Sequence, residues 1–151
     1  MGERPTRMWR AGRAGDPVFA ATEKLFRRYK REHVLNGQWS NLNLPFRSPL
    51  SVNRQKYSDP SDVIFSESGE FAGWGVFSVE VQHVPRFYPP DRPEYGFSVF
   101  HSPLEDNYAH TNIVCDAVPP TGKHVEPRPQ IRKLVRTLLS QRIIREIEAL
   151  V

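Results

Sequence analysis

Residues 76–82 carry the pattern that most restricts the fold of this chain. Three apolar residues alternate with three polar ones: Phe77, Val79 and Val81 with Ser78, Glu80 and Gln82. A period of two places successive side chains on opposite faces of an extended strand. An isolated strand of this kind is not stable, so the pattern predicts a half-buried strand within a larger sheet.

Two later segments repeat the alternation. Tyr95–His101 and Thr111–Val118 each place apolar residues on one face of a strand, and the short run 63–65 is also β-prone. The prolines between these segments mark the connections. We therefore predict a mainly antiparallel sheet from about residue 62 to residue 118.

Helices are expected on both sides of this sheet. Asp16-Pro17 is a helix-start signal, and the stretch from there to about Arg31 is interpreted as a helix. A strand through Leu25–Tyr29 is the competing interpretation, because the residues of this segment also alternate. Strong helix formers run from Gln130 to Val151, so the predicted fold class is α+β, with an N-terminal helix and a long C-terminal helix flanking the sheet.

The expected C-terminal helix has two apolar stripes. Its first half places Ile131, Leu134, Val135, Leu138 and Leu139 on one side, whereas Ile143 and the apolar residues after it lie nearly opposite. Either the helix kinks near residues 140–142, or its second half meets a different surface. A protein partner, or self-association, through residues 130–151 is therefore one hypothesis.

Charge is sorted along the chain. Residues 1–56 carry twelve Lys/Arg against four Asp/Glu, residues 57–127 three against eleven, and residues 128–151 six against two, which together give the net charge of +4. Residues 1–15 contain an arginine at every third position but also Pro5, Gly12 and Gly15, which oppose a stable helix. We expect a disordered basic tail over residues 1–15, followed by a single α+β domain over residues 16–151.

Several classes of protein are disfavoured. No apolar run approaches the ~20 residues of a membrane span, and the single cysteine, Cys115, suits a reducing compartment, so a cytoplasmic protein is expected. The sequence has neither G-x-x-x-x-G-K-[ST] nor G-x-G-x-x-G nor G-x-S-x-G. No cofactor is expected, and no metal site either, because Asp116 and His124 lack convincing ligand spacing relative to the other histidines.

The richest polar segment is 101–112, which joins two predicted strands. It has a histidine at either end of the loop, His101 and His110, with Asn107 between them. Histidine titrates near neutrality, so two imidazoles brought together by the loop would divide the roles of general acid and general base. Asn107 would hold a substrate oxygen or orient one of the two rings. The alternative is ordinary structural hydrogen bonding at strand ends.

A second polar segment is 51–57. Its Arg54 and Lys56 would clamp a phosphate or carboxylate, with neutral hydrogen bonds from Asn53 and Tyr57. A solvated polar turn is the alternative. If this segment folds over the histidine loop, a basic wall would face an acid–base pair.

These residues lead to three hypotheses for function. The first is a small hydrolase or group transferase that acts on an anionic small molecule through His101 and His110. The second is an adaptor that binds a protein through the C-terminal helix. Nucleic-acid binding through the basic N-terminal 56 residues, with Trp9, Tyr29 and Trp39 as stacking groups, is less favoured because the central segment is acidic.

Overall fold

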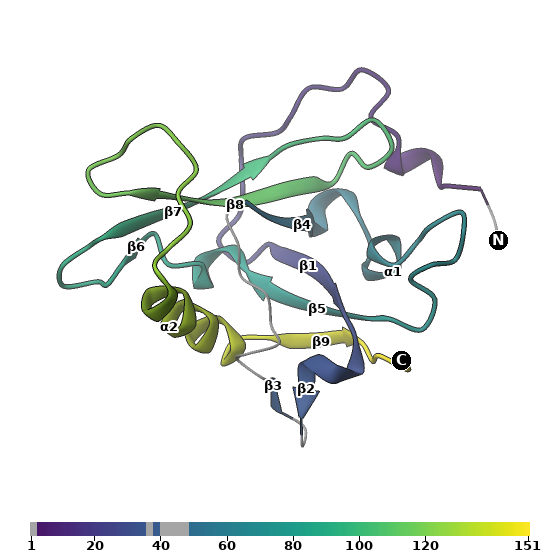
Figure 1. The fold of residues 1–151 in the computed structure, drawn as a ribbon. Helices are drawn as coiled ribbons and strands as arrows, with labels where there is room; N and C mark the ends of the chain where they lie inside the picture. Colours follow the sequence, from purple (N-terminus) through teal and green to yellow (C-terminus); the bar gives the residue numbers. More distant parts are fainter. Residues whose placement is uncertain (1–2, 36–37, 40–48) are drawn as a thin grey trace.

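The computed structural model describes residues 3–35, 38–39 and 49–151, which form an α+β fold around a seven-stranded sheet (Figure 1). Neighbouring strands are antiparallel throughout, in the order β6-β7-β8-β4-β1-β5-β9. The strands are β1 Lys24–Tyr29, β4 Leu50–Arg54, β5 Gly75–Glu80, β6 Phe87–Tyr88, β7 Tyr95–His101, β8 His110–Ala117 and β9 Ile144–Ile147. A separate short ladder pairs β2 Val34–Leu35 with β3 Gln38–Trp39.

The helical elements are few and mostly short. They are α1 Pro60–Val63, α2 Pro129–Ser140 and four 3-10 turns: η1 Thr6–Met8, η2 Arg31–His33, η3 Gln55–Tyr57 and η4 Val81–His83. The α1 turn is fixed by a capping box, in which the Asp59 and Asp62 side chains accept hydrogen bonds from each other's backbone N–H. The β-prone run 63–65 therefore does not form a strand, and that prediction was wrong.

The three strands predicted from alternation are confirmed as β5, β7 and β8. The first of them was expected to be half-buried, but β5 is buried on both faces, and residues 81–82 belong to η4. The sheet nevertheless reaches beyond residues 62–118, because β1, β4 and β9 belong to it. The central position of β1 explains why its pattern was ambiguous. It pairs with β4 on one side and β5 on the other, and Leu25 and Phe26 are both buried although they point to opposite faces.

The expected N-terminal helix was wrong, and the competing interpretation as a strand is confirmed by β1. The helical stripe would have required Val18 to be buried, but its side chain is 68% exposed. Asp16 does cap the backbone locally, since its carboxylate accepts a hydrogen bond from the Val18 N–H at 3.0 Å. Burial of adjacent residues on both faces of a sheet outweighs that local signal.

The long C-terminal helix was also wrong beyond Ser140. Helix α2 ends there, and the second apolar stripe belongs to β9, which pairs with β5 at the edge of the sheet (Figure 1). Glu146 of β9 accepts hydrogen bonds from Lys24 Nζ at 2.7 Å and Ser78 Oγ at 2.9 Å. The two stripes thus reflect a change from helix to strand near the expected kink.

The main core lies between α2 and one face of the sheet. Ile131, Val135 and Leu139 of α2 pack on buried residues of the central strands, among them Leu25, Val52, Val79, Ile113 and Cys115. Burial raises the pKa of the Cys115 thiol to about 11, as expected for a cysteine that packs as a small hydrophobic residue. Phe26 faces the other side of the sheet, where α1 lies.

The N-terminal arginines contact the body of the protein. Arg4 lies 3.7 Å from the Asp106 carboxylate, Arg7 binds Asp62 at 2.7 Å, and the Arg13 guanidinium stacks on Tyr108. Arg10 donates a weaker hydrogen bond to the Pro103 carbonyl oxygen. Residues 3–15, the described part of the segment expected to be a disordered tail, therefore pack against the β7–β8 loop and α1. Two of the four arginines in this segment, Arg4 and Arg7, pair with carboxylates of the acidic central segment.

Candidate functional site

The two polar segments singled out in the sequence lie side by side in the sheet. Strand β4 pairs with β8, and this register places Asn53 directly opposite His110. The Asn107 amide donates a hydrogen bond to Asn53 Oδ1 at 2.8 Å, which joins the β7–β8 loop to β4. Asn53, Asn107 and His110 are thereby brought together on the α1 side of the sheet.

These three residues line a cavity of about 290 Å³. Its walls come from β1, β4, α1, the β7–β8 loop and the N-terminal segment. The apolar part includes Phe26, Val63 and Phe65. The polar part adds the Ser51 hydroxyl, three arginines and two carboxylates that pair with arginines of the N-terminal segment: Arg4, Arg27, Arg28, Asp62 and Asp106. The volume lies near the lower end of the range for small-molecule sites, ~300–1,000 Å³.

The tautomer of His110 follows from its hydrogen bonds. Its Nδ1 lies 2.8 Å from the Ser102 carbonyl oxygen, which can only accept, so Nδ1 carries the proton of the neutral ring. Nε2 is then unprotonated and faces Ser51 Oγ at 3.3 Å, in position to accept the hydroxyl proton. The cavity therefore contains a chain of three hydrogen-bonded groups. The Ser51 hydroxyl faces the His110 imidazole, and the Ser102 carbonyl oxygen orients that ring.

His101 has a different environment. It pairs with Thr111 across the sheet, so alternation puts its side chain on the face opposite to that of His110. Its Nδ1 accepts a hydrogen bond from the Asp16 N–H at 2.8 Å, and its Nε2 donates to the Tyr108 carbonyl oxygen at 2.5 Å. Burial lowers the pKa of His101, which favours the neutral ring. The structure does not bring the two imidazoles into one cavity.

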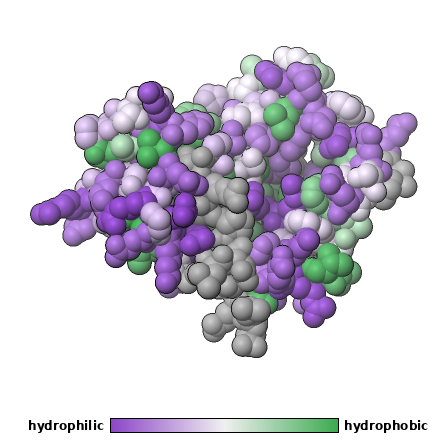
Figure 2. Space-filling model, in the orientation of Figure 1, coloured by the Kyte–Doolittle hydropathy of each residue, from purple (hydrophilic) through white to green (hydrophobic). Residues whose placement is uncertain are grey.

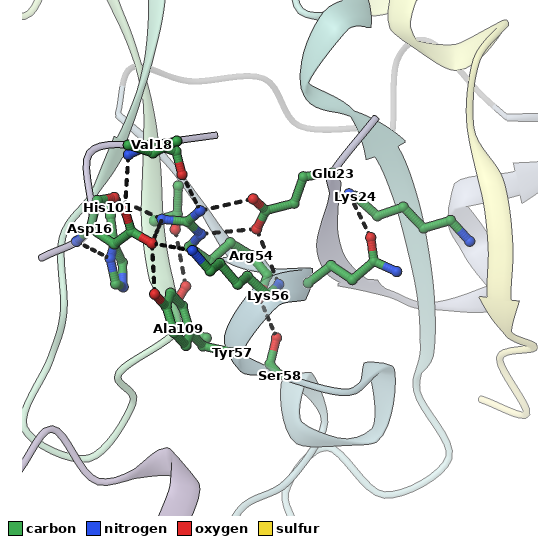
Figure 3. A network of polar contacts seen from close by, with 12 residues as sticks. Asp16, Val18, Glu23, Lys24, Arg54, Lys56, Tyr57, Ser58, His101 and Ala109 are labelled. Carbon is green, nitrogen blue, oxygen red and sulfur yellow. Dashed lines mark hydrogen bonds and ion pairs between the residues drawn. The ribbon is translucent and has the colours of Figure 1, made fainter. Parts of the chain in front are cut away.

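Arg54 is fully buried, and its guanidinium donates its hydrogen bonds to other groups of the chain (Figure 3). Its Nε and Nη2 donate to the two carboxylate oxygens of Glu23 at 2.9 and 2.8 Å. Its Nη1 and Nη2 also donate to the carbonyl oxygens of Asp16 and Val18 at 2.7 and 2.6 Å. The expected anion clamp at Arg54 is thus occupied by the chain's own carboxylate, which fixes residues 16–23 over the sheet.

Lys56 and Tyr57 extend this network toward the surface. Both donate to Asp16 Oδ2, at 2.8 and 2.6 Å, and these two hydrogen bonds hold the pKa of Asp16 well below its usual range. The Tyr57 ring stacks on His101 with 5.4 Å between centroids. Both residues line a separate hollow of about 260 Å³ with Arg7 and Arg13. They do not line the cavity at His110.

Arg28 lines the cavity, and the negative charge of Glu70 acts on its guanidinium without a direct ion pair. It is exposed, its guanidinium lies 3.9 Å from the centre of the Phe71 ring, and it forms no hydrogen bond or ion pair with the described residues. Deeper in the wall, two buried polar atoms, Asn107 Oδ1 and Arg4 Nε, have no hydrogen-bond partner. A negatively charged ligand would add a direct, charge-assisted hydrogen bond at Arg28.

Sequence reasoning missed the position of Ser51, Arg28 and Arg4 at this cavity. Ser51 opens the polar segment, but no local pattern places it beside His110, which comes from β8. Arg28 lies in the segment that was interpreted as a helix. Its approach to the cavity depends on the pairing of β1 with β4, for which no short motif exists.

The residues considered for metal binding and for nucleic-acid stacking mostly have structural contacts. The Asp116 carboxylate accepts hydrogen bonds from Thr121 and Gly122 in the turn after β8. Within residues 3–35, 38–39 and 49–151, no three His, Cys, Asp or Glu side chains form a group that could hold a metal ion. Of the three expected nucleic-acid stacking groups, Tyr29 and Trp39 pack edge-on against each other at 4.7 Å, whereas Trp9 is exposed.

Comparison of the chain with protein-family models, with curated proteins and with solved structures finds no match. In the part of the chain that the structure describes, no helix has the length and apolar character needed to span a membrane. The proposal for function therefore rests on the geometry of the cavity.

Proposed function

We propose that the protein is a small hydrolase or acyl transferase in which Ser51 is the nucleophile and His110 the general base. The observation that carries the proposal is the hydrogen bond from His110 Nδ1–H to the Ser102 carbonyl oxygen at 2.8 Å. It directs the unprotonated Nε2 toward Ser51 Oγ at the cavity. This revises the expected acid–base pair, because Ser51 takes the place of His101.

The reaction would proceed through an acyl-enzyme. Ser51 Oγ attacks the carbonyl carbon of an ester while His110 Nε2 takes the hydroxyl proton. The bond from the carbonyl carbon to the leaving oxygen then breaks, and His110 returns the proton to the departing alcohol. Water attacks the acyl-serine in the second half of the reaction, with His110 again as base, which releases the acid and restores Ser51.

The side-chain amides of Asn53 and Asn107 are the candidate donors to the negative oxygen of the tetrahedral intermediate. Asn53 is on the same face of β4 as Ser51, two residues away, and it lies opposite His110. Their mutual hydrogen bond limits the rotation of both amides, which favours a preorganised donor pair. Arg28 would bind a carboxylate or phosphate elsewhere on the substrate, which makes an anionic ester the expected substrate class.

The test uses two nitrophenyl esters, neutral 4-nitrophenyl acetate and the negatively charged mono-4-nitrophenyl succinate. We expect the anionic ester to be the better substrate, and Ser51→Ala or His110→Gln to lower its turnover by at least ~100-fold. Mass spectrometry of the quenched reaction should find one acyl group on Ser51.

Exposed histidines can hydrolyse nitrophenyl esters without an active site, so His124→Gln is the matched control. His124 is exposed and does not line the cavity. Its replacement should leave turnover unchanged. Equal losses in His124→Gln and His110→Gln, or undiminished turnover in Ser51→Ala, would refute the proposal.

A further inference from the structure

Helix α2 presents a positively charged flank away from the cavity. Arg132, Lys133 and Arg136 form this basic flank, and Arg142 is a further exposed cation in the turn just beyond the end of the helix. No acidic residue occurs between Glu126 and Glu146. Lys133 and Arg142 are exposed and form no ion pair with the described residues, while Arg132 has a 3.5 Å contact with Glu126. The region of α2 in Figure 1 is largely hydrophilic in Figure 2.

Folding stability does not account for this charge. The first turn of α2 contains no acidic residue, and cations in the N-terminal half of a helix oppose its dipole. Arg136 is partly buried, and its Nε has no hydrogen-bond partner. Burial, followed by the like charge of Arg132, lowers the pKa of Arg136. Apart from the contact of Arg132 with Glu126, the flank thus concentrates positive charge without a nearby carboxylate among the described residues, which indicates a partner that supplies negative charge.

The composition of the flank identifies the kind of partner. Arg136, Ser140 and Lys133 are neighbours on the helix surface, and all three are polar. A protein–protein interface is usually centred on apolar or aromatic anchors, which the flank lacks. Single-stranded nucleic acid needs aromatic platforms, and no aromatic residue occurs in residues 127–145. The backbone of a duplex requires only cations and hydrogen-bond donors at phosphate spacing.

We propose that double-stranded nucleic acid binds along the basic flank of α2 through its phosphates. The contacts are to the backbone, so the binding is independent of base sequence and weakens steeply with salt. This surface differs from the N-terminal segment considered in the sequence analysis, whose arginines contact the body of the protein. It is also independent of the proposed chemistry at Ser51.

The test is fluorescence anisotropy of a labelled DNA duplex, titrated with the full chain from about 50 to 200 mM salt. We expect Lys133→Glu with Arg142→Glu to weaken binding at least ~10-fold. The slope of log affinity against log salt should fall by about two, because each phosphate contact contributes ~0.9. The pair Arg92→Glu with Lys123→Glu, on exposed loops, changes the net charge equally and should alter affinity less than ~2-fold.

Three results would overturn the inference. They are the absence of duplex binding by the unmodified chain at low salt, equal losses in both double variants, and binding of polyglutamate in place of the duplex. The last result would assign the flank to an acidic protein. Circular dichroism checks that each variant is folded. If the charge reversals disturb α2, Lys133→Gln with Arg142→Gln must still weaken binding more than the matched neutral pair.

Discussion

Replacement of Arg54 by Met is expected to lower the free energy of unfolding by about 3–5 kcal/mol. The substitution removes all four hydrogen bonds of the guanidinium and leaves the Glu23 carboxylate, which is 8% exposed, without its cation. A buried charge without a partner is among the largest single causes of destabilisation. Urea unfolding monitored by tryptophan fluorescence measures the effect.

Arg128→Met is the matched control for this prediction. Arg128 also binds a carboxylate through two nitrogen atoms, since its Nε and Nη2 donate to Glu94 at 3.1 and 3.0 Å, but both side chains are largely exposed. We expect little change in unfolding. If the Arg54 and Arg128 variants unfold at the same urea concentration, burial of the Arg54 network does not stabilise the fold. Addition of Glu23→Leu to Arg54→Met should recover part of the loss.

The second large effect is expected at Gly75, the first residue of β5. Gly75 lies opposite Tyr29 in the sheet, and a Cβ atom at this position would overlap the Tyr29 ring and approach the Ala149 backbone nitrogen to 2.7 Å. Tyr29 is buried, and its hydroxyl accepts a hydrogen bond from the Ala149 N–H at 3.2 Å. Neither group has room to move, so we expect Gly75→Ala to cost about 1–3 kcal/mol.

Gly96→Ala in β7 provides the comparison. The nearest atoms to a Cβ at Gly96 are 3.6 Å away, which is ordinary van der Waals contact. This variant should be as stable as the unmodified chain or slightly more so, because alanine loses less backbone entropy than glycine on folding. Thermal unfolding of the two variants side by side gives the answer. Equal melting temperatures would contradict the packing described for Tyr29.

The sheet was predictable where one face of a strand is polar. β5, β7 and β8 have this alternation, and their residues identify them without further context. β4 could not be found in this way, because its last two residues, Asn53 and Arg54, are buried although they are polar. Their burial depends on partners from other segments, Asn107 and Glu23, which no local pattern reveals.

The helix predictions were wrong for a related reason. Asp16-Pro17 has the chemistry of a helix start, and Asp16 does accept a hydrogen bond from the Val18 N–H, yet no helix follows. Residues 144–147 are compatible with a helix, but they complete the edge of the sheet beside β5. Tertiary pairing decides between two locally acceptable conformations in both cases.

The candidate site could be predicted only in part. The proximity of segments 51–57 and 101–112 was anticipated, and the pairing of β4 with β8 produces it. The side of the sheet on which each histidine lies depends on strand register, and a shift of one residue reverses it. With Thr111 opposite His101, the two histidines fall on different faces. Both histidines can be identified in the sequence, but the strand register that separates them cannot be predicted from it.

Nitrogen NMR of the histidine rings at about pH 8, where an ordinary imidazole is neutral, tests the geometry on which the proposed chemistry depends. We predict opposite tautomers, with the proton on Nδ1 in His110 and on Nε2 in His101. Ser51→Ala should shift the Nε2 resonance of His110 and leave His101 unchanged. A proton on Nε2 of His110 would contradict the account, because that ring could not accept the Ser51 hydroxyl proton.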